Sequence, residues 1–419
     1  MTDFILSGAK MAGLAGPVDI GVAKGLITAI APSLPGNTRV EALGGWVFPG
    51  YVDAHIHLDK AHILERCDMT RGGLAHAVEE TARAKAGFTT EDVYRRASRV
   101  VDAAVGHGTM ALRSFVEVDP RVGLRGLDAL LALREDRKHQ ITLQICAFAQ
   151  EGITNEPETL TLLSRAMEMG ADLVGGCPYR DPDPVAHIAH VFDLAQRFDC
   201  DADFHIDFDL DPETSDLPAL IAATEARGWG GRVVAGHASK LSAMAPGDVA
   251  TMAARLRDAG IGVVALPATD LFLMGRDADR LQPRGVAPLA GMARAGVRCA
   301  VASNNIMNPF TPYGDANLVR MANLFANVAH LSTDDDLQAC FGMVAGDAAA
   351  LIGLPHRLAV GAPATMVLLS APTPAMAVRA IAPAQAGWVR GRQTFHRPAP
   401  LICAPQGGVP PARGDVTGS

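Results

Sequence analysis

Two histidines separated by a single residue are the most chemically distinctive feature of the sequence. His55 and His57 end the segment VDAHIH, which is typical of a short strand. Side chains alternate along a strand, so both imidazoles point to the same face. Zinc and iron bind imidazole nitrogen readily, and a third imidazole from His205, in FHID, would complete a set of three ligands. We therefore predict one divalent metal ion, zinc or iron, at these three residues.

Further polar residues come at the ends of other apolar runs in the sequence. They are Glu117, Gln150, Cys177, Asp207, His237 and Asn304. His237 could be a fourth ligand or a catalytic group, and we favour a catalytic role because imidazole exchanges protons near neutral pH. Asp207 comes two residues after His205 and is expected on the same face. There it could transfer protons or orient a ligating histidine.

Eight apolar runs alternate with longer amphipathic stretches between residues 52 and 305. The runs begin at Val52, Thr109, Ile141, Asp172, Asp201, Arg232, Gly260 and Val297. One amphipathic stretch, residues 89–108, has Thr89 or Thr90 as its expected N-cap and Gly106 near its end. The alternation predicts a (β/α)8 TIM barrel, with the polar run ends meeting at its C-terminal face. An open doubly wound sheet is the alternative, but HIHLDKAH is not the glycine-rich phosphate loop expected there.

The two ends of the chain have a different texture, rich in valine, isoleucine and glycine without a helical period. Neither end has enough strands to bury a core alone. We predict one small β-sandwich formed by residues 1–48 and 355–403, with residues 49–354 forming the barrel. Residues 404–419 are rich in proline and glycine and are predicted to form a tail.

Composition limits the partners and the compartment. The net charge is -8 and charged residues make up 20% of the chain, without a lysine or arginine cluster. This argues against nucleic acid or an anionic membrane as a partner. The N-terminus lacks the pattern of a signal peptide, and no apolar run is long enough to span a bilayer. Seven scattered cysteines without a C-x-x-C motif predict reduced thiols in a cytoplasmic protein.

The order and spacing of several motifs carry a family resemblance over about residues 47–354. In order, the motifs are HIHLDK, AFAQEG, FHID, AGHASK and SNNIMNPFTPYGDANL. With these motifs the chain resembles the cytosine deaminase and N-isopropylammelide isopropyl amidohydrolase branch of the amidohydrolase superfamily. The resemblance implies a metal-dependent barrel in which activated water attacks an sp2 carbon that bears a leaving amine. It is also compatible with a homo-oligomer.

The resemblance also implies roles for individual residues. The three histidines at positions 55, 57 and 205 are similar to the family's metal ligands, and His237 is similar to its strand-six catalytic histidine. Gln150 is similar to the glutamine that binds the amide edge of the heterocycle, and Phe310 to an aromatic wall of the pocket. Lys60 is similar to the lysine that follows H-x-H in the triazine enzyme. Glu117 is expected at the substrate pocket and is a further candidate for proton transfer.

Three departures from the family pattern affect the mechanism. The strand-eight aspartate, a metal ligand and proton acceptor, falls at Asn304, which carries no charge and cannot act as a base. The proton-shuttling glutamate falls at Phe208, and a strand-two histidine is replaced by Phe115. Strand four ends in GGCPYRD without a lysine, which predicts a single metal. We hypothesise that His237 polarises water or substrate and that Asp207 takes over proton transfer.

The leading functional prediction is a metal-dependent hydrolase that cleaves a C–N bond of a small nitrogen heterocycle and releases ammonia or an amine. A second prediction is hydrolysis of a cyclic amide, an imide or an alkylamino-triazine. A third prediction, from another class of protein, is a non-catalytic barrel that only binds a ligand, because Asn304 and Phe208 replace the usual acidic residues.

Overall fold

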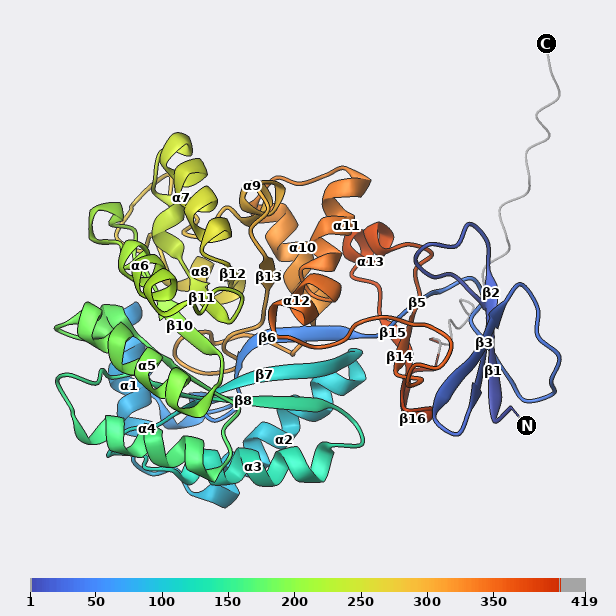
Figure 1. The fold of residues 1–419 in the computed structure, drawn as a ribbon, viewed down its shortest axis with the longest axis horizontal. Helices are drawn as coiled ribbons and strands as arrows, with labels where there is room; N and C mark the ends of the chain where they lie inside the picture. Colours follow the sequence, from blue (N-terminus) through green and yellow to red (C-terminus); the bar gives the residue numbers. More distant parts are fainter. Residues whose placement is uncertain (1, 399, 401–419) are drawn as a thin grey trace, which may run out of the picture.

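A sheet of eight parallel strands forms the centre of the molecule (Figure 1). The computed structural model describes residues 2–398 and residue 400. The strands pair in sequence order. They are β6 (Tyr51–His57), β7 (Thr109–Glu117), β8 (Thr142–Ala149), β9 (Leu173–Gly176), β10 (Ala202–Ile206), β11 (Val233–His237), β12 (Ile261–Ala265) and β13 (Cys299–Val301). Each of the eight apolar runs therefore contains one strand.

The sheet closes on itself where β13 meets β6. Ile56 and Asn304 form a parallel bridge. The backbone amide of His57 donates to the carbonyl oxygen of Asn304 at 2.8 Å, and the amide of Asn304 donates to the carbonyl of His55, also at 2.8 Å. These contacts turn the sheet into a barrel, and they confirm the predicted (β/α)8 fold over the open alternative.

Helices follow the strands and cover the outside of the barrel (Figure 1). They are α1 (Leu74–Lys85), α2 (Thr90–Gly106), α3 (Arg125–Arg137), α4 (Glu158–Met169), α5 (Pro184–Phe198), α6 (Leu217–Arg227), α7 (Pro246–Asp258), α8 (Pro267–Leu273), α9 (Leu289–Arg294), α10 (Leu318–Val328), α11 (Asp334–Gly342), α12 (Gly346–Leu351) and α13 (Pro374–Ala380). Thr89 caps α2 by accepting a hydrogen bond from the amide of Asp92 at 3.2 Å. The predicted cap and the predicted end at Gly106 are therefore both confirmed.

Two four-stranded sheets lie beside the barrel and contain strands from both ends of the chain (Figure 1). One contains β1 (Phe4–Ala9), β2 (Val18–Ala23), β3 (Leu26–Ala31) and β4 (Arg39–Glu41), and the other contains β5 (Trp46–Phe48), β14 (Met366–Leu369), β15 (Ala384–Val389) and β16 (Arg392–His396). Leu6, Ile20, Val47, Met366 and Trp388 are buried in one shared apolar cluster. Burying this cluster requires both ends, as predicted for the small sandwich.

The domain limits at residues 48, 354 and 403 stay predictions, and the predicted tail lies outside the described residues. Within residues 2–398, no helix combines the length and the apolar composition that crossing a bilayer requires.

Candidate metal centre and active site

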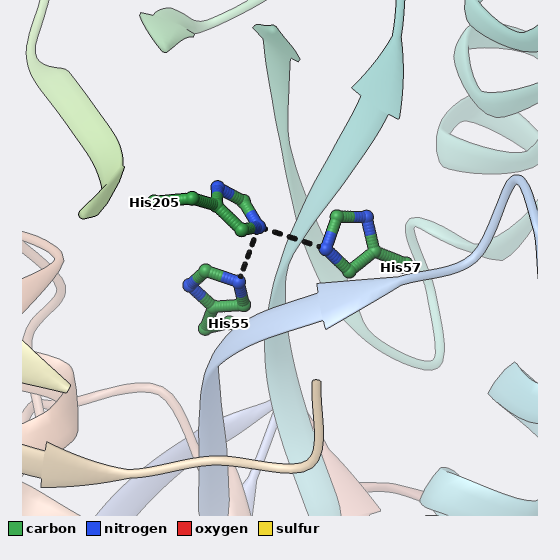
Figure 2. Close-up of side chains that lie close together, drawn as sticks. All are labelled: His55, His57 and His205. Carbon is green, nitrogen blue, oxygen red and sulfur yellow. Dashed lines mark hydrogen bonds between the residues drawn. The ribbon is translucent and has the colours of Figure 1, made fainter. Parts of the chain in front are cut away.

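Three imidazole rings converge at the C-terminal end of the barrel (Figure 2). Nε2 of His205 lies 3.0 Å from Nε2 of His55 and 3.0 Å from Nε2 of His57. His55 and His57 come from β6 and His205 comes from β10, so the cluster spans the barrel interior. Because strand side chains alternate, the H-x-H spacing directs both β6 rings inward.

Small and aromatic neighbours shape the space around these rings. A Cβ atom added to Gly236 of β11 would lie 2.9 Å from Cε1 of His55, so glycine makes room for that ring. The ring of Phe115 packs 4.1 Å from the His55 ring, and Phe148 stacks at 4.8 Å on His205, as distances between ring centroids. The imidazoles are therefore fixed by packing against β7, β8 and β11.

The three imidazoles fit a divalent cation. Burial lowers the pKa of His55, His57 and His205 well below the usual value, so all three are neutral at pH 7. Neutral imidazole is the form that binds metal. Two nitrogen ligands on one zinc ion, each about 2.0–2.1 Å from it, lie about 2.9–3.4 Å apart between right-angle and tetrahedral geometry. The observed separations of 3.0 Å fall in that range.

Asn304 is part of the seam that closes the barrel. Its backbone has a φ of 59°, a left-handed conformation that asparagine adopts more readily than most residues. Its side chain is buried, and both the amide oxygen and the amide nitrogen have no hydrogen-bond partner within the described part of the chain. A buried amide without partners is costly unless a ligand satisfies it. The side chain lines the same cavity as His57 and His205.

His237 forms a buried pair with an aspartate that the sequence analysis missed. Nδ1 of His237 lies 2.7 Å from Oδ1 of Asp270, which belongs to α8 just beyond β12. The other carboxylate oxygen of Asp270 accepts from the amide of Leu266 at 3.1 Å. Burial raises the pKa of Asp270 above its ordinary value. The ring of Phe208 packs over His237 with centroids 3.8 Å apart.

Asp207 does not share the face of His205, although strand alternation predicts that it does. Strand β10 ends at Ile206, and Asp207 has a φ of 54°, which breaks the alternation. Its carboxylate accepts from the hydroxyl of Ser215 at 2.5 Å and from the amide of Asp216 at 2.8 Å. Burial raises the pKa of Asp207 to about 6, but both oxygens are directed at these two partners. Its role in proton transfer stays a prediction.

The cavity beside the three imidazoles combines polar side chains with aromatic rings. It is lined by His57, Lys60, Gln150, Tyr179, His205, Phe208, His237, Thr269, Asn304, Asn305 and Phe310. The structure therefore brings together the predicted residues Lys60, Gln150, Phe310, His237 and Asn304 at one cavity. Glu117 lies behind them, in contact with Lys60.

Lys60 is a buried cation that orders its neighbours. Its Nζ donates to Oε1 of Glu117 at 2.7 Å and to Oε1 of Gln150 at 3.2 Å, and it lies 4.6 Å from the centre of the Phe310 ring. Lysine can only donate, so the carbonyl oxygen of Gln150 must face Lys60. The Gln150 amide nitrogen then points to the sulfur of Cys177, 3.4 Å away.

A second cluster with the spacing of metal ligands contains Glu117, Asp119 and Glu151. The ammonium group of Lys85 lies 2.8 Å, 2.5 Å and 2.9 Å from carboxylate oxygens of these three residues. A cation therefore already occupies the centre of this cluster. Helix α1 supplies Lys85, so the cluster ties that helix to the ends of β7 and β8.

Replacing Glu117 by glutamine is expected to lower the free energy of unfolding by about 3 kcal/mol at neutral pH, because two buried lysines lose a shared carboxylate. Burial would raise the pKa of Glu117, but Lys60 and Lys85 outweigh it and lower the pKa to about 2. The stabilisation is therefore present above about pH 4.5, the ordinary pKa, and is lost as the pH falls towards 2. Urea unfolding of both proteins at several pH values measures the difference.

The matched control is Glu79→Gln, which removes an exposed ion pair with Arg71. That variant is expected to differ from the native protein by less than about 1 kcal/mol. A stability gap for Glu117→Gln that stays constant down to pH 3 would contradict the assigned ion pairs.

Comparison with known proteins identifies the family of the chain. The family model described as amidohydrolase family matches residues 39–395. The chain belongs to the amidohydrolase family. It is therefore a hydrolase of C–N bonds other than peptide bonds, in a family that depends on metal ions. The predicted superfamily and class of enzyme are thereby confirmed.

Individual amidohydrolases are similar to the chain over almost its full length. A pterin deaminase of Rhizobium rhizogenes is 32% identical over 387 residues, 88% of each chain. The N-isopropylammelide isopropyl amidohydrolase of a Pseudomonas species is 28% identical and covers 90% of this chain and 93% of its own length. The crystal structure of 5-methylcytosine deaminase from Klebsiella pneumoniae liganded with phosphonocytosine has a TM-score of 0.91 at 29% identity, covering 96% and 100% of the two chains.

Proposed function

We propose that this amidohydrolase holds one divalent ion, zinc or iron, at His55, His57 and His205. With that ion it hydrolyses a C–N bond between a small planar nitrogen heterocycle and an exocyclic amine. The observation that carries the proposal is the convergence of three neutral imidazoles beside a cavity lined by aromatic rings and amide groups. The relatives support the choice of substrate, since they include a pterin deaminase, an N-isopropylammelide isopropyl amidohydrolase and a 5-methylcytosine deaminase.

A divalent ion bound by the three imidazoles would supply Lewis acidity and lower the pKa of the water it binds. The rest of the chemistry belongs to side chains of the chain. Phe310 and Phe208 offer aromatic faces for a flat ring. Lys60 can donate a hydrogen bond to a ring oxygen, and the oxygen of Gln150 can accept from a neighbouring ring N–H. Together they would fix the ring with its C–N bond towards the imidazoles.

His237 is the best placed group for the proton transfers. Its Nδ1 is held by Asp270, which leaves Nε2 for the cavity that the ring lines. In the proposed reaction the oxygen of water bonds to the ring carbon, and the water proton passes to Nε2. That proton then moves to the exocyclic nitrogen as the C–N bond breaks, so ammonia or an amine leaves. One water is consumed, and His237 returns to its neutral form.

Asn304 is proposed to face the metal with its amide oxygen. Asn304→Asp adds a negative charge there and is expected to raise metal affinity roughly tenfold, because an anionic group binds a cation more strongly than an amide. The measurement is metal content after dialysis against graded chelator concentrations. Asn323→Asp, a change on the partly buried face of α10, serves as the control. Equal metal retention by Asn304→Asp and the native protein would argue against Asn304 at the metal.

The decisive experiment is the release of ammonia or alkylamine from a panel of pyrimidines, pterins, triazines and cyclic ureas. The protein is first loaded with zinc or iron, and its metal content is measured. Turnover of an amino-substituted ring supports the proposal, and release of an alkylamine from a triazine selects the second candidate substrate. Protein that binds one metal but turns over none of the panel would contradict the proposed class of substrate.

A further inference from the structure

The buried pair of His237 and Asp270 has a geometry that fixes which imidazole nitrogen carries the proton. Asp270 is fully buried. One of its oxygens accepts from the amide of Leu266 at 3.1 Å, and the other lies 2.7 Å from Nδ1 of His237. An ionised carboxylate can only accept hydrogen bonds. Nδ1 of His237 must therefore carry a hydrogen, and the neutral ring presents an unprotonated Nε2.

No other carboxylate takes this place in the described part of the chain. The cavity lining contains no aspartate or glutamate. Asp207 is directed at Ser215 and Asp216. Glu117 is directed at Lys60 and Lys85. Asn304, at the end of the barrel seam, is neutral. Among residues 2–398, Asp270 is therefore the one anionic side chain within hydrogen-bond distance of His237.

The position of Asp270 is built into the structure after β12. Helix α8 begins with Pro267, and Asp270 lies one turn into it. The neighbouring Thr269 exchanges a hydrogen bond of 2.6 Å with Thr311, which anchors α8 to the segment after β13. The carboxylate is thus held by its own helix, by the Leu266 amide and by this anchor.

We propose that Asp270 is the positioning residue of the reaction. It holds His237 with Nδ1 protonated and Nε2 free to accept a proton, and it stabilises the imidazolium that results. In this chain the negative charge that assists proton transfer comes from α8, and the neutral Asn304 occupies the end of strand eight. The inference rests on the proposed role of His237, but the protonation state of the ring can be measured without turnover.

The test uses Asp270→Asn. The amide of Leu266 is a donor, so the new asparagine must turn its oxygen towards Leu266 and its NH2 group towards Nδ1 of His237. The proton is then forced onto Nε2, the nitrogen that has to be free. We expect kcat to fall about 100- to 10,000-fold with one equivalent of metal still bound. Nitrogen NMR of 15N-histidine-labelled protein should report the Nε2–H form of His237 in the variant and the Nδ1–H form in the native protein.

A second buried pair offers a matched control. Oδ2 of Asp181 lies 2.9 Å from Nδ1 of His187, both side chains are buried, and neither lines the cavity. Asp181→Asn should lower folding stability at least as much as Asp270→Asn, because Asp181 also accepts from the amides of Ile153 and Thr154, while kcat stays within about threefold of the native value. A loss of activity in Asp270→Asn that came only from damage to the fold would appear in Asp181→Asn as well.

The double variant Asp270→Asn/His237→Asn tests whether Asp270 affects the reaction through His237 or independently of it. If Asp270 acts through the imidazole, Asp270→Asn should cost nothing further in a His237→Asn background. Additive losses, unchanged kcat in Asp270→Asn or an Nε2–H form in the native protein would each overturn the proposal. Because the NMR result does not require a substrate, failure of the panel assay alone would count against the proposed function and not against this assignment.

Discussion

Replacement of His205 by alanine is expected to lower metal affinity by more than about 100-fold and to abolish hydrolysis. His205 is the ring whose Nε2 lies 3.0 Å from both other imidazoles, so its loss leaves two ligands on one strand. Outer-shell changes alone commonly cost 10- to 100-fold in metal affinity, and loss of a direct ligand is expected to cost more. Metal content by mass spectrometry, measured with ammonia release on the same sample, tests both expectations.

His187→Ala is the matched control for that experiment. His187 is as buried as His205 but is paired with Asp181 away from the cavity. It should retain one equivalent of metal in the folded fraction. Retention of metal by His205→Ala, or equal loss by His187→Ala, would show that the three imidazoles are not the ligands.

Replacement of His237 by asparagine is expected to lower kcat by about 100- to 10,000-fold while metal binding is unchanged. Asparagine keeps a side-chain NH2 group that can donate to Asp270, so the carboxylate stays satisfied. What is lost is the nitrogen that accepts and returns a proton. Steady-state kinetics with the best substrate of the panel, at fixed metal occupancy, measures the effect.

Asp207→Asn measured in parallel decides between the two candidate proton carriers. Its carboxylate holds Ser215 and the amide of Asp216, so the expected effect is on stability more than on kcat. A loss of kcat in Asp207→Asn as large as that in His237→Asn, with the fold intact, would return proton transfer to Asp207.

The sequence predicted the fold well because the period of hydrophobic residues is a property of each segment. Each of the eight apolar runs contains a strand, and the cap at Thr89 is a local interaction. The placement of His55, His57 and His205 at one end of the barrel also follows from strand alternation and from the parallel direction of the strands.

The sequence predicted the orientation and the partners of side chains less well where these depend on local backbone conformation or on tertiary contacts. Asp207 was assigned to the face of His205 by alternation, but a left-handed residue at the end of the strand redirects it. The role of Asp270 does not follow from strand alternation, because Asp270 lies in helix α8, four residues beyond Leu266. A signal was present, since an aspartate in an otherwise apolar segment, LPATDLFL, has to find a buried partner.

The contacts that close the barrel involve the same residues as the proposed metal site. At this seam the backbone amide of Asn304 donates to the carbonyl of His55, and the amide of His57 donates to the carbonyl of Asn304. An ion bound by His55, His57 and His205 would connect β6, one side of this seam, to β10 across the barrel. Metal binding and closure of the barrel are then thermodynamically linked, so a change that stabilises the closed barrel also raises the affinity for the metal. Removal of the metal is therefore expected to lower the free energy of unfolding of the barrel.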